Sequence, residues 1–237
     1  MPNRKGTFIT FEGGDGAGKS THLQFVAEAL RMHGEDVICL REPGGTIIGE
    51  QLRSLVLDPG NVAMSNECEL LIYEAARAQL VSQVIKPALD RNAIVLCDRF
   101  TDSTVAYQAF GRGLDRSFVE DASAFACNGI APDRTILMMT GGDAEVGLLR
   151  AMQHKNADRL ELAGKEFHNL VNAAYLQLAK EDPQRIRVVV SNESKTETAK
   201  KVFSEMADLF PWMSDESVCD DAFFEGLVLR RETMGLL

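Results

Sequence analysis

Short apolar runs alternate with longer amphipathic segments along most of the chain. Five of these runs have the length and composition of buried strands, at Thr7–Phe11, Asp36–Leu40, Ala93–Cys97, Thr135–Met139 and Ile186–Val190. Helical patterns lie between them, at Lys19–Met32, Ile48–Leu57, Glu67–Leu89, Ser117–Asn128 and Glu166–Lys180. This alternation predicts a three-layer α/β/α fold, in which helices cover both faces of a mainly parallel five-stranded sheet.

Two segments fit this alternation poorly. Residues 141–164 are polar, mixed in charge and rich in glycine near their start, which predicts a flap, or lid. From Trp212 to Leu237, six acidic residues and two arginines give a net charge of −4 (two minus six). We therefore predict one domain over residues 1–211 and an acidic C-terminal extension over residues 212–237. The extension is expected to be either a solvated tail or an extra docked helix.

Charge and cysteine usage narrow the class of protein. A formal net charge of −10 argues against a nucleic-acid partner, which would require a basic face. The first apolar run ends at Glu12, and no later segment approaches ~18 apolar residues, so we expect no signal peptide and no membrane partner. Five scattered cysteines without a C-x-x-C pair favour small core residues in a reducing, cytoplasmic setting over disulfides or a metal site.

A phosphate-binding motif follows the first predicted strand. The segment Gly13-Gly14-Asp15-Gly16-Ala17-Gly18-Lys19-Ser20 matches G-x-x-x-x-G-K-[ST] and opens a predicted helix, which is the context that the motif requires. Its glycines let backbone N–H groups approach phosphate oxygens, and the helix N-terminus adds further donors. We predict that residues Gly13 to Thr21 bind ATP, with Lys19 at the β and γ phosphates and Ser20 holding Mg²⁺.

A phosphate acceptor would need a second set of cations. The guanine-reading sequence N-K-x-D is absent, since Asn156 is followed by Ala157-Asp158, and this argues against a GTPase. A kinase that accepts a monophosphate needs arginines, because the planar guanidinium can grip a phosphate at two points. Four arginines lie just past or between the predicted strands, although any one of them could be an ordinary surface residue: Arg41, Arg53, Arg77 and Arg99.

Several spaced motifs around these arginines resemble one family, the bacterial thymidylate kinases. Arg41-Glu42-Pro43-Gly44-Gly45-Thr46, with Gly49-Glu50 and Arg53, is similar to the signature after that family's second strand. Glu69-Leu70-Leu71-Ile72-Tyr73-Glu74-Ala75-Ala76-Arg77-Ala78-Gln79 resembles its thymine-stacking helix. Asp98-Arg99-Phe100, then Ser103, Ala106-Tyr107-Gln108 and Gly111-Arg112-Gly113, resembles its next segment. The resemblance runs from about Gly6 to about Val190 and implies a P-loop NTPase fold.

The resemblance implies which residues bind thymidine monophosphate (dTMP). Arg77 and Arg99, with Arg53, would hold the acceptor phosphate, and Tyr73 would stack on the thymine ring. The base edge would be read by Ser103, Thr104 and Gln108. Tyr107 would crowd the 2′ position of the sugar, and Asp15 would accept a hydrogen bond from the 3′-hydroxyl. Two alternatives stay open: Tyr73 and Tyr107 as core aromatics, and Ser103 or Thr104 as the N-cap of the helix after Asp98.

The reaction implied is transfer of the γ-phosphoryl group of ATP to dTMP, giving dTDP for dTTP synthesis. Asp98 ends an apolar run, so it would either lie beside Mg²⁺ or orient Arg99. No general base is evident, and none is needed, because a monophosphate oxygen is already a nucleophile. Catalysis would rest on Lys19, Asp15, Arg99 and a cation from the lid. The alternatives are a kinase of another nucleoside monophosphate or deoxynucleoside, and a P-loop protein that uses ATP as a switch.

The lid is where the sequence departs from the family it resembles. Such enzymes place a catalytic arginine in the P-loop or in the lid, and this P-loop has none. Met152 and His154 stand where lid arginines are common, leaving Arg150, Lys155 and Arg159, of which we predict Arg150 to be catalytic. The strand before the lid ends in Met139-Thr140-Gly141-Gly142, where the family usually has an aspartate. A homodimer is implied by the resemblance alone.

Overall fold

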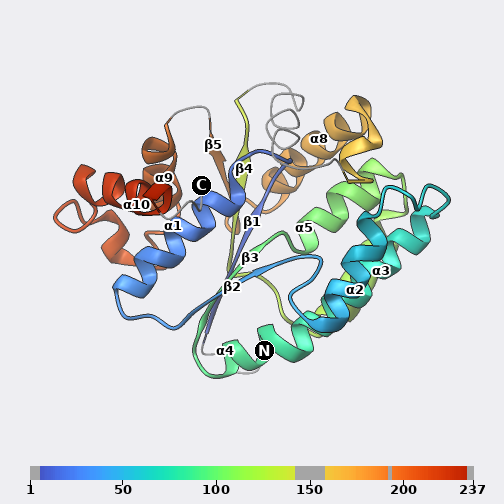
Figure 1. Cartoon of the computed structure of the whole chain (residues 1–237), viewed down its shortest axis with the longest axis horizontal. Helices are drawn as coiled ribbons and strands as arrows, with labels where there is room; N and C mark the ends of the chain where they lie inside the picture. The colour runs from blue at the N-terminus through green and yellow to red at the C-terminus, as the bar shows by residue number, and fades with distance from the viewer. Residues whose placement is uncertain (1–5, 142–157, 192–193, 234–237) are drawn as a thin grey trace.

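A five-stranded parallel sheet runs through the centre of the molecule (Figure 1). The computed structural model describes residues 6–141, 158–191 and 194–233. The strand order is β2-β3-β1-β4-β5, and every neighbouring pair is parallel. The strands are β1 (Thr7–Glu12), β2 (Val37–Arg41), β3 (Ile94–Asp98), β4 (Arg134–Met139) and β5 (Ile186–Val190). The predicted α/β fold and its five strands are confirmed, with shifts of one residue at several ends.

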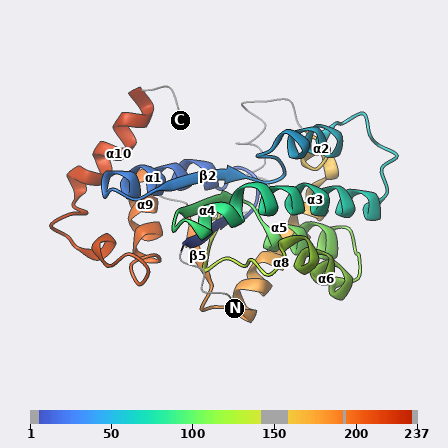
Figure 2. The same cartoon turned by 90° about the horizontal axis from the view of Figure 1, so that it is seen from below.

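Helices cover both faces of the sheet, as Figures 1 and 2 show. On one face lie α1 (Lys19–Met32), α9 (Lys195–Ser204) and α10 (Asp221–Thr233). On the other lie α3 (Asn66–Leu80), α5 (Thr101–Thr104), α6 (Arg116–Cys127) and α8 (Lys165–Glu181), with α2 (Ile47–Leu57) packed on α3. The described chain also contains three shorter helices, α4 (Lys86–Asp90), the 3₁₀ helix η3 (Glu161–Ala163) and the 3₁₀ helix η4 (Pro211–Ser214), besides two π-helical turns.

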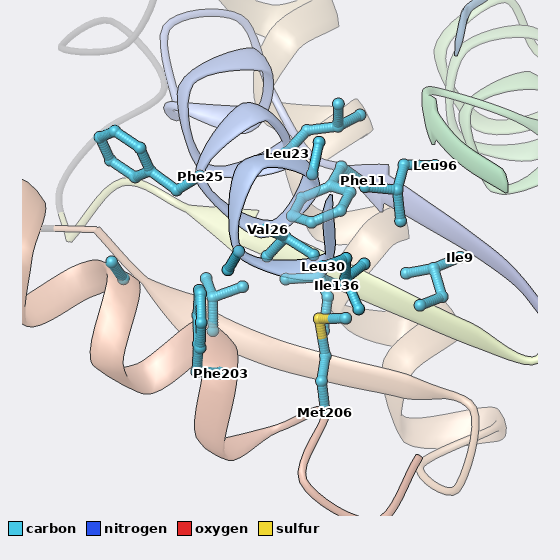
Figure 3. Packing of buried hydrophobic residues seen from close by; sticks show 14 of the residues in the cluster. Ile9, Phe11, Leu23, Phe25, Val26, Leu30, Leu96, Ile136, Phe203 and Met206 are labelled. Atoms are coloured by element: carbon cyan, nitrogen blue, oxygen red, sulfur yellow. The ribbon is translucent and has the colours of Figure 1, made fainter. Parts of the chain in front are cut away.

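The main core lies between the sheet and α1 (Figure 3). Leu23, Val26 and Leu30 from α1 belong to one buried cluster with Ile9 of β1 and Ile136 of β4. Because a central parallel strand is covered on both faces, its residues are apolar in succession rather than in alternation. Burying each large apolar side chain stabilises the fold by roughly 1.5–3 kcal/mol. This packing fixes the loop between β1 and α1 against a rigid support.

Two helical segments differ from the sequence prediction. The predicted helix Glu67–Leu89 continues to Asp90, but a π-helical turn, η1 (Val81–Ile85), interrupts it. The helix expected after Asp98 begins at Thr101 as α5, and it continues as a second π-helix, η2 (Val105–Gly111), which was not predicted. Helix α9 was also missed, because only four of its residues are buried, although Ser194 caps it by accepting from the N–H of Glu197.

The C-terminal segment carries a docked helix rather than a solvated tail. Phe224 and Leu227 of α10 are buried in the same cluster as α1, together with Phe203 of α9. Trp212 stacks on His33, with ring centroids 3.7 Å apart. The division of the chain after residue 211 stays a prediction. None of the helices within the described ranges is long and apolar enough to cross a membrane.

Candidate active site

The phosphate loop between β1 and α1 is built on glycines in conformations that other residues rarely adopt. Gly13, Gly16 and Gly18 have φ values of 126°, 70° and 90°. A Cβ on Gly13 would lie 2.0 Å from the carbonyl oxygen of Met138, so a side chain there would collide with β4. Gly18 is the N-cap of α1, and the first turn of that helix presents free N–H groups to an anion. Thr21 is half-buried in this turn.

Lys19 is folded back over the loop. Its Nζ donates to the carbonyl oxygens of Gly13 at 3.0 Å and Gly14 at 2.8 Å. Burial, and then the positive charge of Arg99, lower the pKa of Lys19 to about 8. A bound phosphate would stabilise this ammonium group, because a nearby anion offsets the cost of burying a positive charge.

Ser20 and Asp98 bring two oxygen ligands together at the end of β3. The Ser20 hydroxyl donates to Oδ2 of Asp98. Hydroxyl and carboxylate oxygens suit Mg²⁺, which typically takes one or two protein ligands and completes its shell with water and phosphate. A larger metal cluster is not present, since no group of three or more His, Cys, Asp or Glu side chains converges within the described ranges. The residues therefore fit a nucleotide-bound Mg²⁺.

A cavity of about 200 Å³ adjoins the phosphate loop. All nine residues that the resemblance assigns to the acceptor line it, and so do Ser20 and Asp98. The nine come from the loop and from α2, α3, α5, η2 and the turn after β3: Asp15, Arg53, Tyr73, Arg77, Arg99, Ser103, Thr104, Tyr107 and Gln108. Residues far apart in the sequence thus converge on one cavity. Their individual roles in binding stay predictions.

Arg99 joins this cavity to the phosphate loop. Its Nη2 lies 2.6 Å from Oδ1 of Asp15, and its Nη1 donates to the carbonyl oxygen of Gly13 at 3.1 Å. The guanidinium also lies over the ring of Tyr107, 5.2 Å from the centroid. Burial raises the pKa of Asp15, but the charges of Arg99 and Lys19 outweigh it and lower the value to about 2. Asp15 is therefore an ionised acceptor shared by both halves of the site.

The alternative role for Asp98, orienting Arg99, finds no direct hydrogen bond among the described residues. The Arg99 guanidinium donates instead to Asp15, Gly13, Ser103 and Tyr175. Burial lowers the pKa of Arg99, but Tyr107, Asp15, Tyr175 and, last, the charge of Asp98 outweigh it and raise the value. The contact with Ser20 is thus the feature that defines Asp98 in this structure.

Among the described residues, Arg77 makes five hydrogen bonds to protein groups and meets two carboxylates, whereas Arg99 makes four and meets one. Glu42 accepts from Nε at 2.9 Å and from Nη2 at 2.8 Å, and Glu74 accepts from Nη1 at 2.6 Å. Thr104 accepts from Nη2 at 2.8 Å and Ser123 from Nη1 at 3.4 Å. These contacts occupy the five N–H donors of the guanidinium, and two carboxylates neutralise its charge. A phosphate on Arg77 would therefore have to displace protein partners.

Arg53 has more capacity to bind an anion. It donates through Nη1 to the carbonyl oxygen of Pro43 at 2.9 Å, and it makes no ion pair with the residues that the structure describes. Burial and the nearby charge of Arg41 lower its pKa, although an arginine stays protonated. Arg41 itself is paired with Glu50 at 2.9 Å. Arg53 and Arg99 are accordingly the two cations best placed for a second phosphate.

Glu12 is a buried carboxylate under this site that the sequence analysis did not identify as functional. Its Oε1 accepts from the N–H groups of Phe100 at 2.7 Å and Ser103 at 3.4 Å. Its Oε2 accepts from the hydroxyls of Ser103 at 2.5 Å and Tyr175 at 3.1 Å. Burial, and then the charge of Asp102, raise the pKa of Glu12 to about 7. Glu12 thus satisfies the N-terminus of α5 and fixes the turn that carries Arg99.

These contacts settle one alternative about α5. Its N-cap residue is Phe100, which makes no side-chain cap hydrogen bond, so the alternative in which Ser103 or Thr104 caps the helix is wrong. Both lie within the helix, where Ser103 bonds to Glu12 and Thr104 accepts from Arg77. The capping function passes to Glu12, whose position on a neighbouring strand could not be read from local sequence.

The two tyrosines serve the core and the cavity at once. Tyr107 is buried among Phe167 and Tyr175, and its hydroxyl lies 3.4 Å from Oδ2 of Asp15. Tyr73 is half-buried against the same cluster. Burial raises the pKa of both hydroxyls, so both stay protonated. Since both rings also line the cavity, the core-aromatic alternative and the binding role are compatible.

Most of the lid, including Arg150 and Lys155, lies outside the described residues. Arg159, on its C-terminal flank, is described. Its Nη2 donates to Oε2 of Glu69, and its Nε donates to the carbonyl oxygen of Val56 at 3.0 Å. These contacts hold Arg159 against α2 and α3. The neighbouring acids Asp158 and Glu161 bond to each other within their own turn, where Oε2 of Glu161 accepts from the N–H of Asp158 at 2.9 Å.

Comparisons with known proteins agree on one family. The family model described as "Thymidylate kinase" matches residues 11–202. The thymidylate kinase of Trichlorobacter lovleyi is 44% identical over 201 residues, covering 82% of this chain and 94% of that protein. The thymidylate kinase of Pseudomonas putida strain GB-1 is 47% identical over 189 residues, covering 80% and 89%. The crystal structure of thymidylate kinase from Ehrlichia chaffeensis matches with a TM-score of 0.68 and 30% identity, covering 84% and 97%.

Proposed function

We propose, from the premise that this chain belongs to the thymidylate kinase family, how its site performs the family's reaction. The protein transfers the γ-phosphoryl group of ATP to dTMP and releases ADP and dTDP. ATP occupies the phosphate loop from Gly13 to Thr21, and dTMP occupies the adjoining cavity. The expected kinase activity, ATP as donor and dTMP as acceptor all follow from this membership.

One observation carries the assignment of the two sites. Besides Lys19 in the phosphate loop, two further cations, Arg53 and Arg99, line the adjoining cavity. Asp15 belongs to both the loop and this cavity. A protein that used ATP only as a switch would need no such second phosphate site. Arg53 and Arg99 are the proposed ligands of the acceptor phosphate. Arg77, whose N–H donors are occupied by protein groups, forms part of the cavity wall. Its assignment as a phosphate ligand stays a prediction.

The chemistry rests on positioning and charge. An oxygen of the dTMP phosphate attacks the γ-phosphorus, and the bond to the bridging oxygen of ADP breaks. Lys19 and the loop amides neutralise the donor, while Arg99 draws the acceptor toward it and is itself positioned by Asp15 and Glu12. No general base is required, because the attacking oxygen is already ionised. Arg150 is the proposed lid cation.

Magnesium is the cofactor that Ser20 and Asp98 fit, and both residues would hold it. When bound, Mg²⁺ supplies positive charge at the phosphate oxygens of the nucleotide. Removal of the metal with EDTA should abolish turnover, and added Mg²⁺ should restore it. Asp98→Asn should raise the Mg²⁺ concentration needed for half-maximal rate, whereas an unchanged metal requirement would contradict this assignment.

The stoichiometry of products tests the function directly. Purified protein is incubated with ATP, dTMP and Mg²⁺, and all nucleotides are separated by chromatography. The proposal predicts one dTDP for each ADP and negligible ADP without dTMP. Release of ADP that does not depend on dTMP would indicate the ATP-switch alternative instead.

A homodimer is the proposed assembly, supported by exposed apolar residues on three adjacent helices. α3 lies between α2 and α6 (Figure 2), and these helices expose Leu55, Leu71, Phe118 and Phe125. Sedimentation should show a dimer that Phe125→Asp converts to a monomer, while Leu229→Asp, on the exposed part of α10, leaves it intact. A monomeric wild-type protein would contradict the proposal. The proposed location is the cytoplasm, in keeping with five free cysteines.

A further inference from the structure

Glu69 is a fully buried carboxylate beside the acceptor cavity. It lies in the first turn of α3, one turn before Tyr73, and its exposed fraction is 0%. Three side chains from other segments donate to it. Gln108 donates through Nε2 to Oε1 at 2.8 Å, Arg112 donates to Oε1 at 3.1 Å and to Oε2 at 3.0 Å, and Arg159 donates to Oε2. A buried carboxylate is stable only when it is paired in this way.

The contact with Glu69 fixes which end of the Gln108 amide can meet a ligand. Burial raises the pKa of Glu69, but hydrogen bonds from Arg112 and Gln108 outweigh it and lower the value, so the carboxylate is ionised at neutral pH. An ionised carboxylate only accepts hydrogen bonds, and only the NH₂ end of a glutamine amide donates them. The carbonyl oxygen of Gln108 is therefore its substrate-facing group, and Gln108 lines the cavity.

We propose that Glu69 is a positioning residue that sets acceptor choice, because it holds Gln108 with its carbonyl oxygen toward the base. A carbonyl accepts a hydrogen bond from the ring N–H at position 3 of thymine. Cytosine has an unprotonated acceptor at that position, so it would meet the carbonyl with two lone pairs opposed. The inference rests on the proposed function and extends it to a residue that does not itself line the cavity.

The two arginines also determine how a glutamine at position 69 would be oriented. Arg112 and Arg159 can only donate; two of their N–H groups donate to Oε2 of Glu69, and one, on Nε of Arg112, donates to Oε1. In Glu69→Gln, the amide oxygen is favoured at the Oε2 position, where it keeps two of the three arginine hydrogen bonds, and the new NH₂ group then faces Gln108. Gln108 then has to rotate its amide by half a turn to accept that hydrogen bond. Its own NH₂ group would face the cavity and would match cytosine in place of thymine.

The experiment compares dTMP with dCMP as acceptors on each protein preparation. The ratio of the two kcat/KM values does not depend on the fraction of folded enzyme, so partial unfolding cannot imitate a change in choice. For Glu69→Gln we expect the ratio of dTMP to dCMP to fall by about tenfold or more, and tenfold corresponds to ~1.4 kcal/mol. Glu69→Asp, which keeps an acceptor-only carboxylate, should preserve the ratio even where it lowers the rate.

Two further variants separate positioning from a structural role. Gln108→Leu should lower the ratio by itself, and adding Glu69→Gln to it should change the ratio no further. The matched control is Glu181→Gln, since Glu181 also accepts from a glutamine, Gln177, and from an arginine, Arg116, but on the exposed surface. It should leave both activity and ratio unchanged.

The outcomes are distinct. An unchanged ratio in Glu69→Gln, or a fall of equal size in Glu69→Asp, overturns the inference while the kinase function stands. If Glu69→Gln does not fold, an unchanged ratio in Gln108→Leu overturns it instead. A wild-type protein that phosphorylates neither dTMP nor dCMP contradicts the proposed function itself.

Discussion

Replacing Glu12 with glutamine should remove a pH dependence from the stability of the fold. Glu12 is fully buried and accepts hydrogen bonds from Phe100, Ser103 and Tyr175. Burial and the neighbouring charge of Asp102 raise its pKa from 4.5 to about 7. Glutamine has nearly the same shape, and its NH₂ group can donate hydrogen bonds to the hydroxyl oxygens of Ser103 and Tyr175. The substitution therefore removes the ionisation and keeps most of the packing.

The sign and size of the effect follow from linkage. A carboxyl group whose folded pKa is raised contributes stability while it is protonated, so the contribution is complete below pH 4.5. It is lost as the pH rises through about 7, because the folded state must then bury the charge. The rise from 4.5 to about 7 corresponds to about 3 kcal/mol, at ~1.4 kcal/mol for each pH unit.

Urea denaturation monitored by circular dichroism at pH 5, 6, 7 and 8 measures this contribution. The free energy of unfolding of the wild type should fall by roughly 2–3 kcal/mol relative to Glu12→Gln across this range, because part of the total is already lost at pH 5. Other titrating groups, including Glu42, whose pKa is also raised to about 7 by burial, cancel in the difference. Glu181→Gln serves as the control, because its pKa is lowered to about 2 by hydrogen bonds from Arg116 and Gln177. A difference that stays constant from pH 5 to 8 would refute the reasoning for Glu12.

Three further predictions address the nucleotide sites, the lid and α10. Lys19→Ala should abolish turnover and ATP binding while dTMP still binds, and Arg99→Ala should do the converse in calorimetry with each ligand; equal damage to both would contradict separate sites. Arg150→Ala should lower kcat strongly with little change in the KM for dTMP, and Lys155→Ala should lower it only about tenfold, or ~1.4 kcal/mol. A near-normal kcat in Arg150→Ala would refute that choice of lid cation. Leu227→Ala should destabilise the fold by roughly 2–5 kcal/mol, because Leu227 is buried in the main core, without changing KM, whereas Leu229→Ala at an exposed position should not. Equal unfolding curves for the two leucine variants would mean that α10 adds no stability.

The sheet and the phosphate loop could be predicted from sequence because their signals are local. The central strands are buried on both faces, so they appear as continuous apolar runs. The glycines of the loop are required at fixed spacing by backbone conformation, as the 2.0 Å approach of a Gly13 Cβ to Met138 illustrates. The cavity residues were predicted because their motifs carry a family resemblance, and periodicity alone would not have assembled them.

Other features could not be predicted, because they depend on contacts between distant segments. Glu12 and Glu69 are acids, which a single sequence places on the surface by default. Their partners lie far away along the chain: Tyr175 is 163 residues from Glu12, and Arg159 is 90 residues from Glu69. The π-helix η2 that carries Tyr107 and Gln108 has no periodic signal of its own, since π turns are rare and depend on tertiary packing. The Ser194 and Glu197 spacing was a signal for α9 that could have been used.

The most direct test of the account is an acceptor panel measured by ADP release. Wild-type protein is assayed with ATP, Mg²⁺ and each of dTMP, dUMP, UMP, dCMP and AMP, and kcat/KM is compared across the five acceptors. Tyr107, Asp15 and Gln108 line the cavity, and their proposed roles, at the sugar, as an ionised acceptor and with a carbonyl toward the base, predict that dTMP is preferred. UMP should be disfavoured by a large factor, because buried polar groups left unpaired discriminate strongly. If dCMP or AMP proves the best acceptor, the account of this site is wrong.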